Sequence, residues 1–213
     1  MKTKHLLLVI LAGSLMIASC TRYPGETERL TEDLVVLTQY NTKADFSEYS
    51  TYSIPDSMVY YTDSDSGRIM NSNTALVINQ IVTNMNARGY SRVAPNENPD
   101  LGFNVTYFQN INVTVYYPGW YWGYPGYYPP DYWYGGYYGW DYYYPYYPAY
   151  VSTYTTGTVT IDVADFLNVD EINHKIPMVW DVYIRGLLTG YHTSGEITGS
   201  IDQAFAQTPQ FAK

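Results

Sequence analysis

The feature that most constrains the fold is a strict two-residue alternation of apolar and polar side chains that begins at Leu101. The apolar residues at odd positions are Phe103, Val105, Tyr107, Ile111, Val113 and Val115, and the even positions include the polar residues Asn104, Thr106, Asn110, Asn112 and Thr114. Successive side chains of a strand point to opposite faces, so this pattern predicts a strand with one face buried and the other in water. The run exceeds the usual ~3–10 residues of a strand, which predicts a break near Gln109–Asn110.

Other stretches of the chain also have strand patterns. Residues 158–164 alternate in the same way and predict another half-covered strand, and residues 178–188 predict a strand that pairs beside it. The apolar side chains on the covered face of these two strands are Val159, Ile161 and Val163, and Trp180, Val182 and Ile184. Shorter strands are predicted at 34–40, 49–54 and 90–93, and Pro55 ends the second of these. We interpret 56–67 and 165–177 as loops.

Two helices are predicted. Apolar residues recur every three or four positions in Ser66–Ala87, with Ser66 or Asn71 as the cap and Gly89 in the left-handed position after the end. A short final helix is predicted to begin at a Ser200 cap and to end before Pro209. Together these elements predict an α+β fold, a two-layer sandwich in which two helices cover one face of a mostly antiparallel or mixed sheet.

Residues 116–150 differ in composition from the rest of the chain. These 35 residues contain 16 Tyr, 4 Trp, 6 Pro and 6 Gly, and no Val, Ile or Leu. Pro and Gly at this density are typical of low-complexity sequence, so we interpret the segment as a long loop inserted between two strands. Tyr and Trp combine a flat apolar ring with a polar tip, which makes the segment a candidate contact surface.

Three active roles and one neutral role fit this aromatic insert. It can stack on sugar rings of a glycan or of peptidoglycan, lie on lipid headgroups, where Trp and Tyr are favoured, or self-associate. The neutral alternative is a low-complexity expansion that has no ligand. The candidate binding residues are Trp120, Trp122, Tyr127, Trp133, Tyr137 and Trp140.

The N-terminus has the organisation of a secretory leader. Lys2 and Lys4 precede an apolar run that starts at Leu6, and small residues follow before Cys20. The apolar run is shorter than the roughly 20 residues needed to span a bilayer. Cys20 is the only cysteine of the chain, and it stands where a lipobox places its modified thiol. We therefore predict that residues 1–19 are a lipoprotein signal peptide and that Cys20 becomes the acylated N-terminus.

This prediction makes membrane lipid the first partner and places the protein in the cell envelope. Two or three acyl chains on Cys20 give stable anchoring, and we expect an outer-membrane location that faces either the periplasm or the cell surface. Residues 20–33 are polar and acidic and are interpreted as a flexible tether, and residues 34–213 as one domain interrupted by the insert. The formal net charge of −9, without any basic run, argues against nucleic acid as a partner. Envelope proteins or glycans are the remaining candidates.

Five short motifs occur in a recognisable order. They are Tyr49–Tyr52, Arg88–Tyr90, Asn98–Leu101, Gly157–Val163 and Met178–Trp180. In this order the chain resembles the envelope lipoproteins of the domain of unknown function 4136 family, over roughly residues 34–211.

The resemblance implies a lipid-anchored periplasmic or outer-membrane domain with a mixed α/β layer fold, and no established activity. Family members often have a basic residue after the last tryptophan of these motifs, whereas this chain has Asp181.

The sequence contains no recognisable catalytic or metal-binding motif. His174 and His192 fall in predicted loops, and the Asp170–His174 stretch lacks the spacing of a zinc site, so we predict surface or structural roles for both histidines. Carboxylates are scattered, and none forms a pair on one element as glycoside hydrolysis requires. We therefore predict a non-catalytic interaction or structural module with no cofactor and no metal. The alternatives are a glycan- or peptidoglycan-binding lipoprotein that uses the insert, and an envelope hydrolase whose site is unrecognised.

Overall fold

The computed structural model describes residues 34–62, 64–109, 113–117, 144–146, 150–154, 157–172 and 175–212. The strands are β1 (Val35–Tyr40), β2 (Thr51–Ser53), β3 (Met58–Tyr61), β4 (Ser66–Ile69), β5 (Ser91–Arg92), β6 (Leu101–Phe108), β7 (Val113–Tyr117), β8 (Tyr144–Tyr146), β9 (Tyr150–Tyr154), β10 (Thr158–Asp165) and β11 (Lys175–Arg185). The helices are α3 (Ser72–Ala87) and α4 (Ser194–Ala206), with short 3₁₀ turns η1 (Pro95–Glu97) and η4 (Pro209–Phe211).

The main sheet is mixed and open, with the strand order β1-β11-β10-β6-β2-β5. The three pairs β1–β11, β11–β10 and β10–β6 are antiparallel. Both β2 and β3 pair in parallel with β6, β2 at its start and β3 at its end. Since β10 occupies the other edge of β6 along its whole length, β2 and β3 share a single edge and act as one strand interrupted around Pro55. The predicted end of a strand at Pro55 is confirmed.

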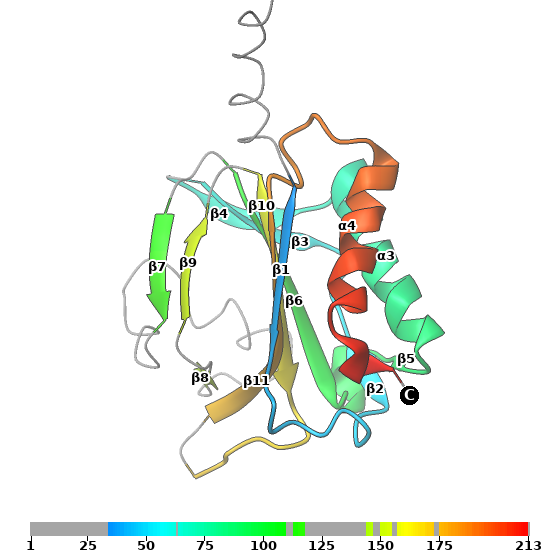
Figure 1. The fold of residues 1–213 in the computed structure, drawn as a ribbon. Helices are drawn as coiled ribbons and strands as arrows, with labels where there is room; N and C mark the ends of the chain where they lie inside the picture. Colours follow the sequence, from blue (N-terminus) through cyan, green and yellow to red (C-terminus); the bar gives the residue numbers. More distant parts are fainter. Residues whose placement is uncertain are drawn as a thin grey trace, which may run out of the picture. The chain divides into compact units, whose positions relative to one another are not determined.

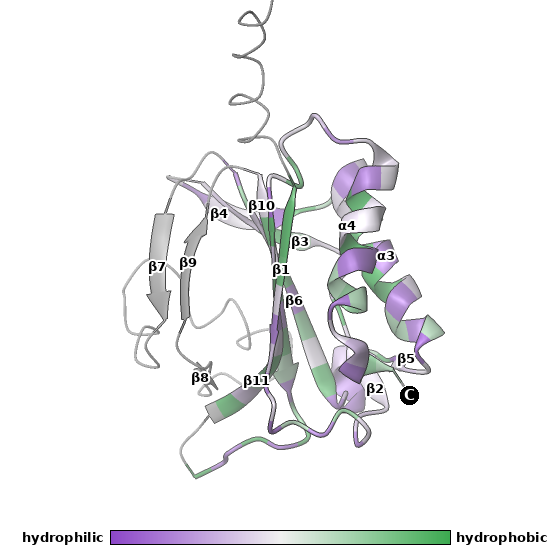
Figure 2. Ribbon diagram, in the orientation of Figure 1, coloured by the Kyte–Doolittle hydropathy of each residue, from purple (hydrophilic) through white to green (hydrophobic). Residues whose placement is uncertain are grey.

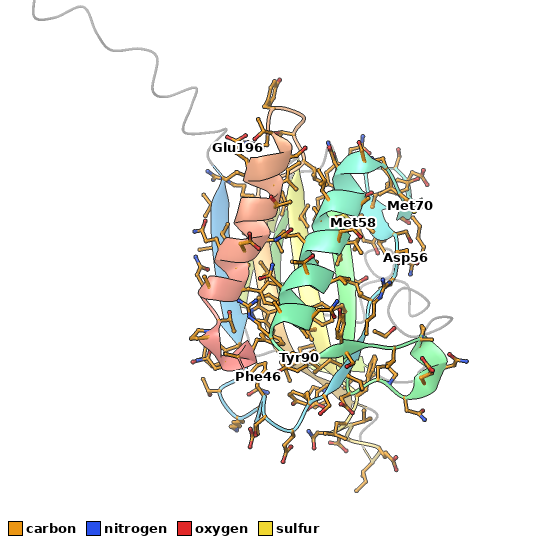
Figure 3. The ribbon with its side chains drawn as sticks, turned by 90° about the vertical axis from the view of Figure 1, so that its right-hand side faces the viewer. Phe46, Asp56, Met58, Met70, Tyr90 and Glu196 are labelled. Carbon is orange, nitrogen blue, oxygen red and sulfur yellow. The ribbon has the colours of Figure 1, made fainter. Side chains whose placement is uncertain are left out.

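The two helices lie on the same face of the main sheet (Figure 1). They pack against each other, and Figure 3 shows them side by side in front of the sheet, with Glu196 near the start of α4. Both helices carry hydrophobic and hydrophilic residues (Figure 2), and the buried apolar ones join those of the strands in one core. The predicted α+β class, with two helices on one face of a mixed sheet, is therefore confirmed.

Helix α3 begins later than predicted. Its cap is Asn71, whose side chain accepts hydrogen bonds from the backbone N–H groups of Asn73 and Thr74. Ser66, the other cap considered, instead begins β4, which pairs with β3. The end of the helix at Ala87 is as predicted, and Gly89 adopts the left-handed conformation with φ of 87°.

Helix α4 begins earlier than predicted. Its cap is Thr193, and Thr193 and Glu196 form a reciprocal capping box. The Ser200 hydroxyl, which was predicted to cap the helix, lies within it and donates to the carbonyl of Glu196 at 2.9 Å. Two glycines, at 195 and 199, weakened the helical pattern in the sequence, whereas the capping box and the burial of Ile197 against the sheet extend the helix to this point.

Two predicted loops contain strands. Residues 56–67 include β3 and the start of β4, which are joined by a tight turn in which the Thr62 N–H donates to the Asp65 carbonyl at 2.8 Å. Strand β8 lies inside the aromatic insert and pairs in parallel with β11 from Lys175 to Pro177, so β11 also begins earlier than predicted. The insert additionally supplies the last two residues of β7 and the first residue of β9.

The break predicted near Gln109–Asn110 is confirmed. Strand β6 ends at Phe108, and β7 begins at Val113 in a separate two-stranded sheet with β9. The prediction that one face of the long strand is in water is wrong. On β6, Asn104 and Thr106 are buried like the apolar residues Phe103 and Val105, and on β10 Thr160 and Asp162 are buried too. The central strands are therefore covered on both faces.

An aromatic cluster closes the end of the core opposite Glu196. The rings of Phe205 and Phe211 lie 4.7 and 4.9 Å from that of Trp180, and the Trp180 Nε1–H donates to the Thr208 hydroxyl at 2.8 Å. The Tyr90 hydroxyl donates to the carbonyl of Phe46 at 3.1 Å, and Figure 3 shows both residues at this end of the helices. The C-terminal turn is thus part of the core.

Gly102 provides a test of the packing at the start of β6. A Cβ at this position would lie 2.3 Å from Cε2 of Phe166, which is too close for two carbon atoms that are not bonded to each other. We expect Gly102→Ala to lower the free energy of unfolding by roughly 1–3 kcal/mol, the usual cost of overpacking, as measured by urea denaturation followed by circular dichroism.

Gly199 is the matched control for this substitution. It lies within α4 and is exposed, and a Cβ at this position would meet no neighbouring atom within 4 Å. Gly199→Ala should raise the free energy of unfolding by roughly 0.5–1 kcal/mol through helix propensity. Equal effects of the two substitutions would contradict the contact between Gly102 and Phe166.

Candidate functional site

A row of oxygen-bearing side chains crosses the middle of the main sheet. Asp181 of β11 pairs directly with Asp162 of β10. Gln39 of β1 opposes Asp181 on the outer side, and Asn104 of β6 opposes Asp162 on the inner side. Because the apolar residues that alternate with them belong to the core beneath the helices, these four side chains stand on the other face of the sheet. We refer to Gln39, Asp181, Asp162 and Asn104 as the polar row.

The centre of the polar row is almost completely buried. Asp181 and Asp162 are 7% and 8% exposed, and Asn104 is 4% exposed. Directly opposed residues of an antiparallel pair have Cβ atoms about 4.5–5.5 Å apart, so the two carboxyl groups are close neighbours. Two buried carboxylates side by side are unfavourable, because both lose hydration and each repels the other.

Hydrogen bonds satisfy this cluster only in part. The Asn104 Nδ2–H donates to the Thr106 hydroxyl at 3.1 Å. By contrast, within the part of the chain that the structure describes, neither Oδ1 of Asp181 nor the hydroxyl oxygen of Thr160 has a hydrogen-bond partner. Thr160 lies two residues from Asp162 on the same face of β10. One unsatisfied oxygen atom therefore belongs to the carboxyl pair, and the other lies on the same face two residues from Asp162.

Electrostatics favours a proton on this pair. Burial raises the pKa of Asp181 well above its ordinary value of 3.8, and the negative charge of Asp162 raises it further. The two carboxyls titrate together, so the proton belongs to the pair and not to one residue. A carboxyl pair of this kind can hold a proton or a small cation. Because the pair is buried, it presents no surface on which a polymer such as a glycan could bind.

The residues predicted to bind lipid or ligand lie outside the described residues. These are Cys20, and Trp120, Trp122, Tyr127, Trp133, Tyr137 and Trp140 in the insert. The structure therefore does not test them.

The histidines give no second site among the described residues. His174 is outside them, and Nδ1 of His192 lies 4.0 Å from Oε2 of Glu196, the residue that completes the α4 capping box. No group of three or more His, Cys, Asp or Glu side chains gathers in the described ranges.

Sequence reasoning missed the carboxyl pair because it searched for pairs on one element. The sequence did contain a signal for the pair. Asp162 and Asp181 occupy polar positions of the alternating pattern in two strands that were predicted to be neighbours. Only the register of that pairing places them opposite each other. The expectation that the polar face of these strands is exposed to water also hid the site, because a carboxylate in water needs no partner within the protein.

Comparison with known proteins identifies the family. The family model described as "Domain of unknown function (DUF4136)" matches residues 36–210. The chain belongs to the DUF4136 family. The resemblance inferred from the five motifs is thereby confirmed.

Two solved structures are similar to this DUF4136 chain. A DUF4136 family protein from Bacteroides thetaiotaomicron is 27% identical, with a TM-score of 0.67 over 84% of this chain and 97% of that one. A PDZ domain protein from Parabacteroides distasonis is 11% identical, with a TM-score of 0.36 over 86% of this chain and 38% of that one. None of the curated proteins matches the chain.

The carboxyl pair predicts an unusual dependence of stability on pH. Because the pKa of Asp181 is raised in the folded state, the folded protein holds a proton that the unfolded chain gives up. The free energy of unfolding is therefore greatest at a pH below 3.8, the ordinary pKa of this carboxyl group, and it falls as the pH rises toward the raised pKa of the folded state. We expect Asp181→Asn to remove this fall and to be roughly 1–3 kcal/mol more stable than the wild type at neutral pH.

The measurement is urea denaturation of both proteins from pH 4 to pH 8 in buffer with EDTA, so that only protons balance the charge. Parallel stability curves for the two proteins would contradict the raised pKa.

Proposed function

We propose that this DUF4136 protein is a lipid-anchored lipoprotein of the cell envelope whose domain acts as a non-catalytic interaction or structural module. The observation that carries the proposal is the leader pattern of residues 1–19 directly before Cys20, the only cysteine of the chain. Strand β1 begins at Val35, so the polar tether between them allows the domain to stand at most about 50 Å from the membrane.

The described surface supports an interaction role that depends on the insert. Among the described residues, the exposed large apolar side chains come from four places: β1, the turn before α3, the β10–β11 connection and the β11–α4 connection. They are Leu37, Met70, Leu167, Ile172 and Tyr191. Single exposed apolar residues are ordinary on protein surfaces, and the polar row is buried. The aromatic insert is therefore our proposed contact segment, with glycans or envelope proteins as its partners.

In the same described part of the chain, no helix is long and apolar enough to cross a membrane. The proposed attachment therefore depends on acylation of Cys20. A single acyl chain holds a protein only marginally, with an association constant on the order of 10⁴ M⁻¹, whereas two or three chains anchor it stably.

Substitution of the cysteine tests the anchor. We expect Cys20→Ala to abolish the incorporation of radiolabelled palmitate and to move the protein from the detergent phase to the aqueous phase in Triton X-114 partitioning. Ser19→Ala, next to the same position, should retain both properties. Full detergent partitioning of the Cys20→Ala protein would exclude a lipid anchor at this residue.

Substitution of the four tryptophans of the insert tests the contact segment. Replacing Trp120, Trp122, Trp133 and Trp140 together with Ala should lower retention on insoluble peptidoglycan by roughly tenfold or more, since stacked rings each contribute about 0.5–1.5 kcal/mol. The matched control is Tyr191→Ala, which removes an exposed aromatic ring (76% exposed) outside the insert.

Both variants should keep the melting curve of the wild type by circular dichroism. Retention that survives the loss of all four tryptophans would assign peptidoglycan binding to another surface. If the wild type itself is not retained on peptidoglycan, partners are sought by cross-linking in intact cells, with loss of a cross-linked product in the tryptophan variant as the same test.

A further inference from the structure

We propose that Asp162 and Asp181, together with Asn104 and Thr160, form a binding site for a hard divalent cation, with Ca²⁺ as the preferred ion. The site lies on β6, β10 and β11, on the face of the sheet away from the helices, and it includes no residue of the anchor or of the insert. The proposal does not depend on the proposed function.

The first argument is charge. Asp181 is directly opposed to Asp162 in the antiparallel register, and both side chains are more than nine-tenths buried. In the described part of the chain, no basic side chain forms an ion pair with Asp181, and the charge that acts on it is the like charge of Asp162. Arg185 stands on the same face of β11, but four residues along a strand correspond to about 13 Å. Among the described residues, therefore, Asp181 has no positively charged partner that offsets the charge of Asp162.

The second argument is the unsatisfied oxygen atoms. Within the described residues, Oδ1 of Asp181 and the hydroxyl oxygen of Thr160 are buried without a hydrogen-bond partner. Native proteins rarely leave such groups unpaired, so each of them needs a physical explanation, and a bound ion is one. One shared proton between the carboxyl groups does not reach Thr160. A cation between the strands can contact both unsatisfied oxygens and both carboxylates.

The third argument is the chemistry of the donors. The proposed ligands Asp162, Asp181, Asn104 and Thr160 offer carboxylate, amide and hydroxyl oxygens, and they include no thiol and no imidazole. Oxygen-only ligands suit Ca²⁺ and Mg²⁺ and not zinc or copper. Calcium accepts irregular sets of six to eight oxygen atoms, whereas magnesium requires near-octahedral geometry and retains several waters. A buried, irregular site built on strands therefore favours calcium. Exposed fractions of 7% and 8% for the two carboxyls exclude a sugar or peptide as the occupant.

The experiment uses the full chain purified from membranes in detergent and dialysed against EDTA. Its melting temperature is measured by circular dichroism with EDTA, with 1 mM CaCl₂ and with 1 mM MgCl₂ at pH 7.5. A ligand that binds only the folded state raises the melting temperature. We expect CaCl₂ to raise that of the wild type by several degrees and MgCl₂ to raise it less, and ⁴⁵Ca²⁺ equilibrium dialysis to find one ion per chain.

Two variants and one control make the test specific. The melting temperatures of Asp181→Asn and of Asp162→Asn, each made separately, should not rise with CaCl₂. Each variant should also bind ⁴⁵Ca²⁺ at least tenfold more weakly than the wild type in equilibrium dialysis. Glu171→Gln removes an exposed carboxylate from the β10–β11 connection and should behave as the wild type. In EDTA, Asp181→Asn is expected to melt at a higher temperature than the wild type. CaCl₂ should reduce or reverse this difference in melting temperature, because it stabilises only the wild type.

Three results would overturn the proposal. If CaCl₂ leaves the melting temperature of the wild type unchanged and dialysis finds no ion, the pair holds a proton only. If the shift is equal in the wild type and in both asparagine variants, calcium binds elsewhere on this acidic chain. If MgCl₂ stabilises the protein more than CaCl₂ does, the preferred ion is wrong.

Discussion

The opposition of Asp162 and Asp181 across two central strands is the constraint on which the rest of the site depends. The two strands pair in register over their central residues, and their apolar residues are held by the helix-side core. A slip of the register by one residue would separate the two carboxyls, but it would also move Val163 or Val182 out of that core, because a shift of one residue exchanges the two faces of a strand. The unfavourable pair is retained because the favourable packing on the opposite face requires the same register.

The core that holds this register is closed by the C-terminus. Trp180 precedes Asp181 in β11 and points to the helix side, where it bonds to Thr208 and contacts Phe205 and Phe211. Helix α4 and the turn after it thus fix the position of the residue next to the carboxyl pair. Because neighbouring residues of β11 point to opposite faces of the sheet, Trp180 lies in the aromatic cluster on the helix side and Asp181 lies in the carboxyl pair on the other side.

Much of the secondary structure could be predicted from the sequence, and the failures have specific physical causes. The alternation of Leu101–Phe108 and of Thr158–Asp165 predicted both central strands, and Gly89 predicted the end of α3. Strand β3 was missed because its pairing partner on β6 is more than forty residues away in the chain, at Thr106–Phe108. The start of α4 was missed because Gly195 and Gly199 lower helix propensity, which tertiary packing of Ile197 overcomes.

The sequence by itself determined the leader pattern, the period of the strands, the apolar faces of the helices and the family to which the chain belongs. The first three are local properties, because each depends on residue types within a window of one element, whereas the family follows from the order of five short motifs along the chain. Only the tertiary structure decided that the polar faces of β6, β10 and β11 are buried, and that Asp162 and Asp181 meet there. Burial and register depend on which segments cover a strand and how it aligns with its neighbour, and no alternation within one strand contains that information.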